Sequence, residues 1–439
     1  MLISFTLENY RSFKERHMVI CQPDEKIKMH KENILQTKNA DILKVISIFG
    51  HNASGKSNII KALNVLKKLL SYDNDLKELL KQVYEPFLYD DVMKNKPTYF
   101  EIELLINNKL VRYSIEFNNK EILSEKLIEI NQNNEESIIL QSSEIEFYYD
   151  VYNCKYVDEI GKSSKNNKLN IDMLDKIKQD FISSLVSNSD FKFKTLLTLK
   201  DKIALPIKEW FLNKLIILHN SNEFIELLML PSHKQYGELF LSDKQNSDTN
   251  KTIKNKILDF VSGADLAIKY IFSKKEENVR GNKSYHFFSQ HTVFKQDGTY
   301  DTMPMSFFET ESTGTQRLFM LSKEIINVIS NGGILVIDEL DKNLHPLLLF
   351  YVVQYFNSSL TNPKGSQLLF TTHNSELLDF GDLRADQILF VSKNRKEFSS
   401  IYPLFKYKIN HDVSLSNLYL FGSFGAIPKL PTGFNIGEK

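Results

Sequence analysis

Residues 50–57 read Gly50-His51-Asn52-Ala53-Ser54-Gly55-Lys56-Ser57, which fits the pattern G-x-x-x-x-G-K-S. The run before this octet, residues 43–49, is short, mostly apolar and rich in β-branched side chains, as expected of a buried strand. After the octet, apolar side chains recur at helical spacing: Ile59, Ile60, Leu63, Leu66, Leu69 and Leu70. The stretch therefore predicts a strand, a loop and a helix that begins at the loop, as in an α/β fold.

The residue types in this loop suit the binding of a phosphate chain. Glycines let backbone N–H groups approach phosphate oxygens, and the N-terminus of the following helix adds its positive dipole end. Lys56 would reach the β- and γ-phosphates, and the hydroxyl of Ser57 would ligate Mg²⁺. The alternative is a glycine-containing turn before an ordinary helix, but the combination of strand, loop and helix favours phosphate binding. We expect this loop to bind a nucleoside triphosphate.

A second landmark is residues 333–339, Gly333-Ile334-Leu335-Val336-Ile337-Asp338-Glu339, in which an apolar run ends in two acidic residues. A fully apolar run suits a central parallel strand, and its carboxyl end lies at the edge of the sheet where α/β proteins bind ligands. We expect Asp338 to hold Mg²⁺ and Glu339 to orient and polarise the attacking water. An exposed acidic turn is the alternative, and the presence of the phosphate-binding loop disfavours it.

Two further segments have polar residues next to apolar patterns. Residues 368–374 form an apolar run that ends at His373, one strand–helix–strand unit beyond Glu339. Upstream of the acidic strand, Ser312, Gly314 and Gln316 open a predicted helix, whose N-terminus is a second place for an anion. Taken alone, the histidine could be structural and the serine a plain helix cap. Their order along the chain favours a role in phosphate chemistry.

Composition restricts the class of protein. The 439 residues are enough for two or three domains, and 55 Lys+Arg balance 55 Asp+Glu, so the net charge does not indicate a nucleic-acid partner, although a local basic patch stays compatible with one. Two distant cysteines, Cys21 and Cys154, fit a reducing compartment rather than a disulfide framework. The apolar runs are too short to cross a membrane and the first residues do not form a signal sequence. We therefore expect a soluble, cytoplasmic protein.

The ordered set of motifs resembles an ABC/SMC-type ATPase head. The set comprises the phosphate-binding loop, the Ser312–Gln316 segment as the signature, the acidic strand with Leu340-Asp341 after it, and His373. The turn Glu8-Asn9-Tyr10-Arg11-Ser12-Phe13 resembles that of SMC-, RecF- and OLD-like ATPases, in which an asparagine such as Asn58 follows the loop. Four segments resemble the RloA/AbiL-type ATPases of bacterial anti-phage systems: Asp338-Glu339-Leu340-Asp341, Leu344-His345-Pro346, Leu383-Arg384-Ala385-Asp386-Gln387 and Phe421-Gly422-Ser423-Phe424-Gly425-Ala426-Ile427-Pro428. The resemblance covers residues 1–130 and 285–430.

This resemblance implies ATP and Mg²⁺ as ligands and assigns a role to each matching residue. Lys56, Glu339 and His373 would be catalytic, and Ser57 and Asp338 would hold the metal. The nucleotide would contact Gly50, His51, Asn52, Ala53, Ser54, Gly55, Lys56, Ser57, Asn58 and Arg11. In a dimer, Ser312, Gly314 and Gln316 would face the partner's γ-phosphate, and Asp341 would belong to the D-loop between the subunits. Gln82 is the candidate for the Mg²⁺-sensing glutamine of such heads.

We expect an α/β fold, an ABC-type P-loop ATPase head with a mixed sheet and an antiparallel subdomain, interrupted by a mainly helical insertion. Residues 1–130 would form the N-terminal half, in which residues 98–130 alternate apolar and polar side chains as in a β-meander. Residues 131–284 would be the insertion, which lacks the sustained heptads of a long coiled coil. Residues 285–439 would complete the head with the signature, the acidic strand and His373.

The function we expect is that of a sensor or regulator ATPase in a bacterial anti-phage, abortive-infection system. It would dimerise around ATP and control a partner effector, such as a Toprim- or RloB-like nuclease encoded nearby. One alternative is that the chain is itself a nuclease, through Asp338 and Asp341 or through Arg280 and His286, whose spacing matches some RNases. Others are a scaffold that binds ATP and hardly hydrolyses it, and a DNA-repair ATPase of the RecF type.

Overall fold

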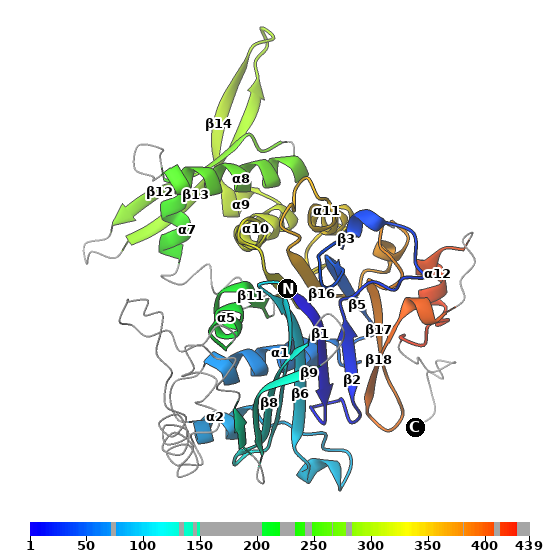
Figure 1. The fold of residues 1–439 in the computed structure, drawn as a ribbon. Helices are drawn as coiled ribbons and strands as arrows, with labels where there is room; N and C mark the ends of the chain where they lie inside the picture. Colours follow the sequence, from blue (N-terminus) through cyan, green and yellow to red (C-terminus); the bar gives the residue numbers. More distant parts are fainter. Residues whose placement is uncertain are drawn as a thin grey trace, which may run out of the picture.

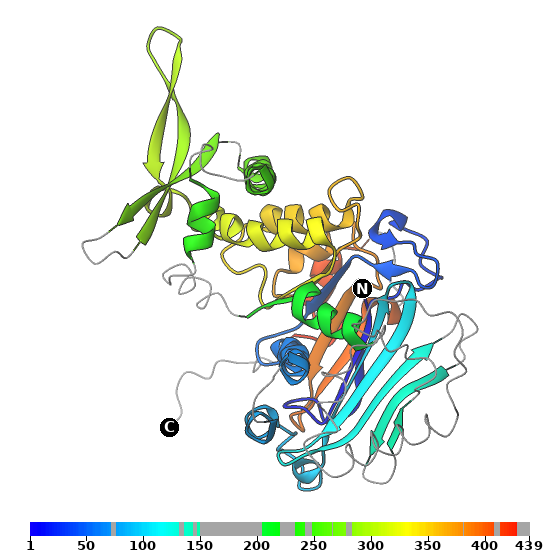
Figure 2. The same ribbon diagram turned by 60° about the vertical axis from the view of Figure 1, so that its left-hand side comes forward.

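The computed structural model describes residues 1–71, 76–130, 136–143, 147–149, 204–219, 233–241, 248–265, 267–277, 283–380, 382–407 and 413–427. Figures 1 and 2 show its arrangement from two sides. Within these residues, no helix is both long enough and apolar enough to span a membrane.

A six-stranded sheet forms the centre of the head. Its order is β11-β15-β16-β5-β17-β18, and all neighbours pair in parallel except the last two. The strands are β11 (Leu215–Leu218), β15 (Ile334–Ile337), β16 (Gln367–Thr372), β5 (Val45–Phe49), β17 (Ile388–Lys393) and β18 (Ser399–Pro403). Every residue of β5, β15 and β16 is buried, because helices or a second sheet cover both faces of the central sheet.

The two faces of the central sheet belong to different hydrophobic cores. On one face, Ile46 and Ile48 of β5 pack with α1 (Lys56–Ser71) and with the antiparallel sheet. On the other face, Val45 and Phe49 pack with α10 (Thr313–Asn331) and α11 (Pro346–Asn357). The helix that follows the phosphate-binding loop is thus enclosed between two sheets, which makes its N-terminus a rigid platform.

The second sheet is antiparallel and has seven strands in the order β10-β9-β8-β7-β6-β1-β2. Its strands are β1 (Leu2–Glu8), β2 (His17–Ile20), β6 (Thr98–Ile106), β7 (Lys109–Phe117), β8 (Ile122–Ile130), β9 (Glu136–Ser143) and β10 (Phe147–Tyr149). The predicted meander over residues 98–130 is present, and its turn at Asn107 and Asn108 has φ values of 50° and 61°, which suit a two-residue hairpin loop.

Parts of the predicted insertion, residues 131–284, belong to the sheets of the head. Strand β9 continues the antiparallel sheet by pairing with β8, and β11 is an edge strand of the central sheet. The predicted boundary at residue 130 therefore does not coincide with the end of a sheet. Helices in this range are α5 (Ala204–Glu209), the π-helical turn η3 (Trp210–Lys214), α7 (His233–Leu239) and α8 (Asp248–Ala264). The division of the chain into three domains stays a prediction.

A three-stranded antiparallel sheet projects from the head, and its long hairpin points away from the body in both views (Figures 1 and 2). It consists of β12 (Tyr270–Glu277), β13 (Lys283–Phe294) and β14 (Tyr300–Ser306). The remaining elements are η1 (Lys31–Asn33), β3 (Ile34–Leu35), β4 (Ile42–Leu43), α2 (Leu76–Val83), η2 (Met93–Asn95), α9 (Phe307–Thr310), η5 (Ser375–Leu378), η6 (Leu404–Lys406) and α12 (Leu415–Leu420).

Candidate active site

The loop after β5 has a backbone that only glycine tolerates at two positions. Gly50 and Gly55 have φ values of 157° and 111°. A Cβ atom at Gly50 would overlap the carbonyl oxygen of Val391, and one at Gly55 would overlap the hydroxyls of Ser399 and Ser12. The two glycines therefore let the loop fold tightly between β17, β18 and the N-terminal turn.

Lys56 begins α1, and its side chain turns back into this loop. Its ammonium group donates hydrogen bonds to the carbonyl oxygens of Gly50 at 2.6 Å and His51 at 3.1 Å. Burial lowers the pKa of Lys56 to about 8, although Asp338, Asp341 and Glu339 act in the opposite direction. The loop thus holds the ammonium of Lys56 at its opening, where phosphate oxygens would replace the two carbonyl oxygens as hydrogen-bond acceptors.

The aspartate at the end of β15 meets the loop. The hydroxyl of Ser57 donates to Oδ1 of Asp338 at 3.0 Å, and Thr371 of the neighbouring strand β16 donates to the same oxygen at 2.6 Å. The parallel pairing of β15, β16 and β5 brings these three strand ends to one edge of the sheet. A serine hydroxyl beside an aspartate oxygen is a pair of hard oxygen ligands, which fits Mg²⁺ bound through few protein ligands and the substrate's phosphates.

The backbone of Glu339 is held in an unusual conformation next to this pair. Its φ is 52°, in the left-handed region that few non-glycine residues adopt. The N–H of Glu339 donates to Oγ1 of Thr371 at 2.7 Å, and its carbonyl oxygen accepts from the guanidinium of Arg317 at 3.0 Å. Such strain collects at functional sites, where surrounding contacts maintain it.

His373 and Asp341 belong to the same cluster. The backbone N–H of His373 donates to Oδ2 of Asp341 at 3.1 Å. Burial lowers the pKa of His373 and the charge of Lys56 lowers it further, while Asp341, Glu339 and Asp338 oppose this shift. The imidazole is therefore mainly neutral at pH 7, so that one ring nitrogen can donate and the other can accept a hydrogen bond.

The predicted signature residues cap their own helix. The hydroxyl of Ser312 accepts from the N–H of Thr315 at 3.1 Å, and the side-chain amide of Gln316 donates to the carbonyl oxygen of Glu311 at 2.8 Å. Gly314 lies against the loop that follows the acidic strand, since a Cβ there would be 3.2 Å from the carbonyl oxygen of Asn343. Ser312 is exposed, as a contact to another subunit requires, and this contact stays a prediction.

Arg11 and Asn58, both predicted to contact the nucleotide, have protein partners. Arg11 forms a two-pronged ion pair with Glu85, with N–O distances of 2.6 and 2.8 Å. The side-chain amide of Asn58 donates to the hydroxyl of Ser12 at 2.8 Å. In this structure both residues connect the N-terminal turn to its surroundings, and their predicted nucleotide contact is untested.

The other candidates lie away from this cluster or outside the described residues. Gln82 is exposed on α2. His286 lies on the projecting strand β13, where its Nε2 is 3.3 Å from a carboxylate oxygen of Glu276, and Arg280 lies outside the described residues. The structure thus places His286 in a different part of the molecule from the phosphate-binding loop.

Three residues of the site escaped the sequence analysis. Thr371 and Arg317 both contact Glu339, and Tyr419 of α12 reaches the loop. Burial raises the pKa of Tyr419 to about 12, and a hydrogen bond with the backbone of Gly50 opposes that shift. Thr371 lies two residues before His373, and this proximity could have identified it from the sequence. No local sequence pattern points to Tyr419.

Two solved structures with similar folds are SMC heads. One is the "SMC head domain from Thermotoga maritima", with 13% identity and a TM-score of 0.42, covering 93% of this chain and 99% of that chain. The other is described as "the SmcHead bound to the C-winged helix domain of ScpA", with 13% identity and a TM-score of 0.45, covering 92% and 97%. No curated protein matches the sequence at a significant level.

One protein family matches most of the chain. Its description is "AAA domain, putative AbiEii toxin, Type IV TA system", and the match extends over residues 45–379, from the strand before the phosphate-binding loop to the end of the turn after His373. This range includes Lys56, Ser57, Asp338 and Glu339, which the fold brings to one edge of the central sheet. The chain belongs to this AAA-domain family of P-loop ATPases.

Proposed function

We propose that the protein binds ATP with Mg²⁺ and hydrolyses it slowly, and that the nucleotide acts as a switch. The observation that carries this proposal is the 3.0 Å contact between Ser57 and Asp338, which come from the two sequence motifs that together bind Mg²⁺-nucleotide in P-loop proteins. Lys56 precedes Ser57 in the chain, and Glu339 lies in the same cluster because the Thr371 hydroxyl is hydrogen-bonded to both Asp338 and Glu339.

Each residue of the cluster has a distinct part in this reaction. Lys56 would exchange its carbonyl partners for the β- and γ-phosphates, and Ser57 and Asp338 would hold Mg²⁺. When bound, Mg²⁺ neutralises charge that develops on the phosphates. Glu339 orients the attacking water, and neutral His373 donates a hydrogen bond to the γ-phosphate. Thr371 keeps Asp338 in place through its 2.6 Å hydrogen bond.

The active form we propose is a dimer with two shared sites. Ser312, Gly314 and Gln316 of one chain would meet the γ-phosphate bound by the partner. The exposed start of α10, which also adjoins the loop after Glu339, supports this arrangement. Hydrolysis removes the phosphate that connects the two faces, so the state of the nucleotide sets the geometry of the dimer.

We place this ATPase in a bacterial anti-phage system as the sensor or regulator of a partner effector, such as a Toprim- or RloB-like nuclease encoded nearby. The support is the resemblance of the acidic strand and of residues 421–428 to RloA/AbiL-type ATPases, together with the match to an AbiEii-type family. Co-expression with the product of the adjacent gene tests this role. The absence of a complex, with or without ATP, would argue against it.

The hydrolysis itself is tested with two substitutions. Lys56→Ala should abolish ATP binding, and Glu339→Gln should bind ATP but slow hydrolysis on the order of 10²–10³-fold, because it removes the group that orients water. Calorimetry and phosphate release measure the two steps. Lys68→Ala, an exposed lysine on the same helix, serves as the matched control and should leave both unchanged. Hydrolysis by Glu339→Gln at the wild-type rate would show that another group orients the water.

A further inference from the structure

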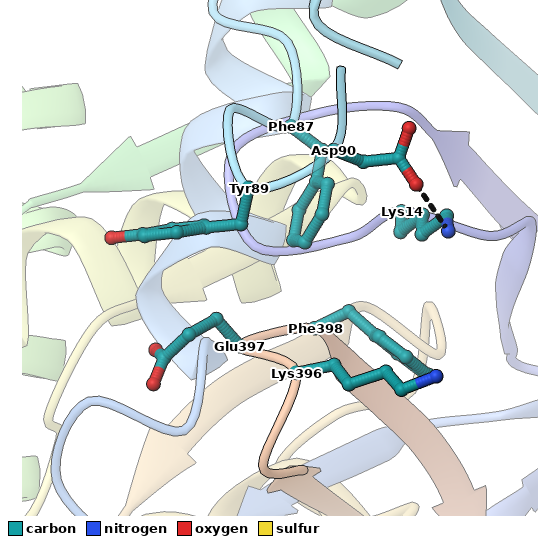
Figure 3. A pocket seen from close by; sticks show the side chains of 7 residues that line it. All are labelled: Lys14, Phe87, Tyr89, Asp90, Lys396, Glu397 and Phe398. Carbon is teal, nitrogen blue, oxygen red and sulfur yellow. Dashed lines mark hydrogen bonds and ion pairs between the residues drawn. The ribbon is translucent and has the colours of Figure 1, made fainter. Parts of the chain in front are cut away.

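A pocket of about 370 Å³ opens between two loops that come from opposite ends of the chain (Figure 3). Phe87, Tyr89 and Asp90 line one wall together with Lys14, and residues 396–398 line the other. The volume is within the range of small-molecule sites. Each wall contains both aromatic and charged side chains. None of the residues that line it belongs to the phosphate-binding loop.

The first wall is attached to the N-terminal turn that also supports the phosphate-binding loop. The side chain of Asn9 accepts from the N–H of Phe87 at 3.0 Å and donates to the carbonyl oxygen of Lys96 at 2.8 Å. In the same turn, Lys14 forms a 2.7 Å ion pair with Asp90. Ser12, two residues before Lys14, is hydrogen-bonded to Asn58 at the start of α1.

The second wall is attached to the phosphate-binding loop directly. Ser399 follows Phe398, and its hydroxyl donates to the carbonyl oxygen of Ser54 at 2.5 Å. The hydroxyl of Ser12 lies 2.8 Å from the same oxygen atom of Ser399 and can donate to it. Two residues of extended chain span at most about 7 Å. Lys14 of the first wall and Phe398 of the second therefore lie within the reach of a nucleoside whose phosphates bind at Gly55 and Lys56.

We infer that this pocket takes the nucleobase of the triphosphate bound at residues 50–57, an inference that rests on the proposed function. The faces of Tyr89 and Phe398 supply stacking surfaces for a base. At the edge of the pocket, the ammonium of Lys396 can donate to an acceptor on a base edge. The carboxylate of Glu397 forms an ion pair with Lys393, whose ammonium lies 5.8 Å from the centre of the Tyr89 ring. Since Phe398 and Tyr89 come from segments more than 300 residues apart in sequence, the base would join the two ends of the chain.

The experiment compares ATP with inorganic tripolyphosphate, which lacks the base, by calorimetry of the full chain with Mg²⁺. Tyr89 is 69% exposed, so Tyr89→Ala should leave the fold intact. Because stacking on an aromatic ring is worth roughly 1–3 kcal/mol per base, this variant should bind ATP about 5- to 150-fold more weakly. Its affinity for tripolyphosphate should stay at the wild-type value. Phe398→Ala should show the same contrast.

Two controls make the result specific. Leu88→Ala alters the neighbouring residue, which is 70% exposed and does not line the pocket, and should leave ATP affinity unchanged. Tyr89→Phe retains the ring and should retain ATP affinity. Unchanged ATP affinity in both Tyr89→Ala and Phe398→Ala would overturn the inference and leave the proposed function standing. A wild-type protein that binds neither ligand would overturn the proposed function itself.

Discussion

Lys56 shows how the fold changes the chemistry of one side chain. Its ammonium is enclosed by the loop, and burial rather than a like charge lowers its pKa to about 8. Three acidic residues, Asp338, Asp341 and Glu339, keep that pKa from falling further. At neutral pH the lysine is therefore mostly charged, but only a small increase in pH neutralises it.

ATP binding should therefore weaken as the pH rises above about 8. The phosphates favour the ammonium form, so the pKa of Lys56 is higher in the complex than in the free protein and binding takes up a proton. Affinity is then full below the free-state pKa and falls above it, by up to about tenfold per pH unit. Calorimetry from pH 7 to 9.5 measures this. Lys56→Arg, which stays charged, provides the control, and an equal decline in that variant would assign the effect to another group.

Arg317 is a second residue whose role depends on its surroundings. It lies on α10, one residue after Gln316, and is buried, and its Nε lacks a hydrogen-bond partner among the residues that the structure describes. Burial lowers the pKa of its guanidinium, and Asp341 and Glu339 oppose that shift. Through its 3.0 Å contact with the carbonyl oxygen of Glu339, Arg317 connects the signature helix to the acidic strand within one chain.

At the scale of elements, α12 connects two loops of the site. At its N-terminus, Ser414 and Ser416 contact the carboxylate of Asp379, just after the turn that follows His373. Near its other end, Tyr419 packs on Phe49, the residue before Gly50, with ring centroids 6.1 Å apart. Its hydroxyl donates to the carbonyl oxygen of Ala426 at 3.4 Å. The helix thus fixes the start of the phosphate-binding loop relative to the histidine.

Removing the hydroxyl of Tyr419 should weaken ATP binding without unfolding the protein. Tyr419→Phe keeps the ring packing against Phe49 but loses the hydroxyl that donates to the carbonyl oxygen of Ala426 at 3.4 Å and interacts with the backbone of Gly50. Losing one such hydrogen bond costs about 1 kcal/mol, so affinity should fall by up to about fivefold. The matched control is Tyr407→Phe, which loses a 3.2 Å hydrogen bond to the carbonyl oxygen of Phe424 away from the loop. Thermal melts and ATP titrations of both variants are needed. Equal affinities in the two variants would contradict a positioning role for Tyr419.

At the scale of the whole molecule, the proposed dimer makes a prediction about mixtures. Lys56→Ala removes phosphate binding, and Gly314→Arg blocks the approach of the signature to the partner's γ-phosphate, so each variant alone should be inactive. Mixed chains should regain one intact site per heterodimer. Phosphate release measures the recovery, and native mass spectrometry confirms the heterodimers.

A side chain at Gly314 would crowd the carbonyl oxygen of Asn343, so Gly314→Arg could inactivate the protein by distorting its own chain. A second signature variant separates this effect from a block of the subunit contact. Thr313 is exposed at the first turn of α10, so Thr313→Arg blocks the same surface without entering the chain's own core. Heterodimers that form but remain inactive with both signature variants would show that the site is not shared.

One segment singled out by resemblance has a structural role that only the folded chain shows. In the run Leu383-Arg384-Ala385-Asp386-Gln387, Arg384 and Asp386 form a buried ion pair at 2.7 Å, and Asp386 also accepts from the N–H of Asp24. Gln387 accepts from Asn33 at 2.8 Å. This segment therefore holds residues 24–33 against the central sheet and is distant in sequence from the phosphate-binding loop.

The sequence alone determined the strand–loop–helix unit, the acidic strand and the meander, and it predicts phosphate and metal chemistry at Lys56, Ser57, Asp338 and Glu339. These features are local: burial imposes a short-period pattern on each element, and the loop's glycines and lysine are adjacent in the chain. The tertiary structure alone decided that Ser57 touches Asp338 through the order of the strands, that β9 and β11 join the sheets of the head, and that Thr371, Arg317 and Tyr419 support the site. Contacts between residues hundreds of positions apart depend on strand order and packing, which leave no periodic trace in the sequence.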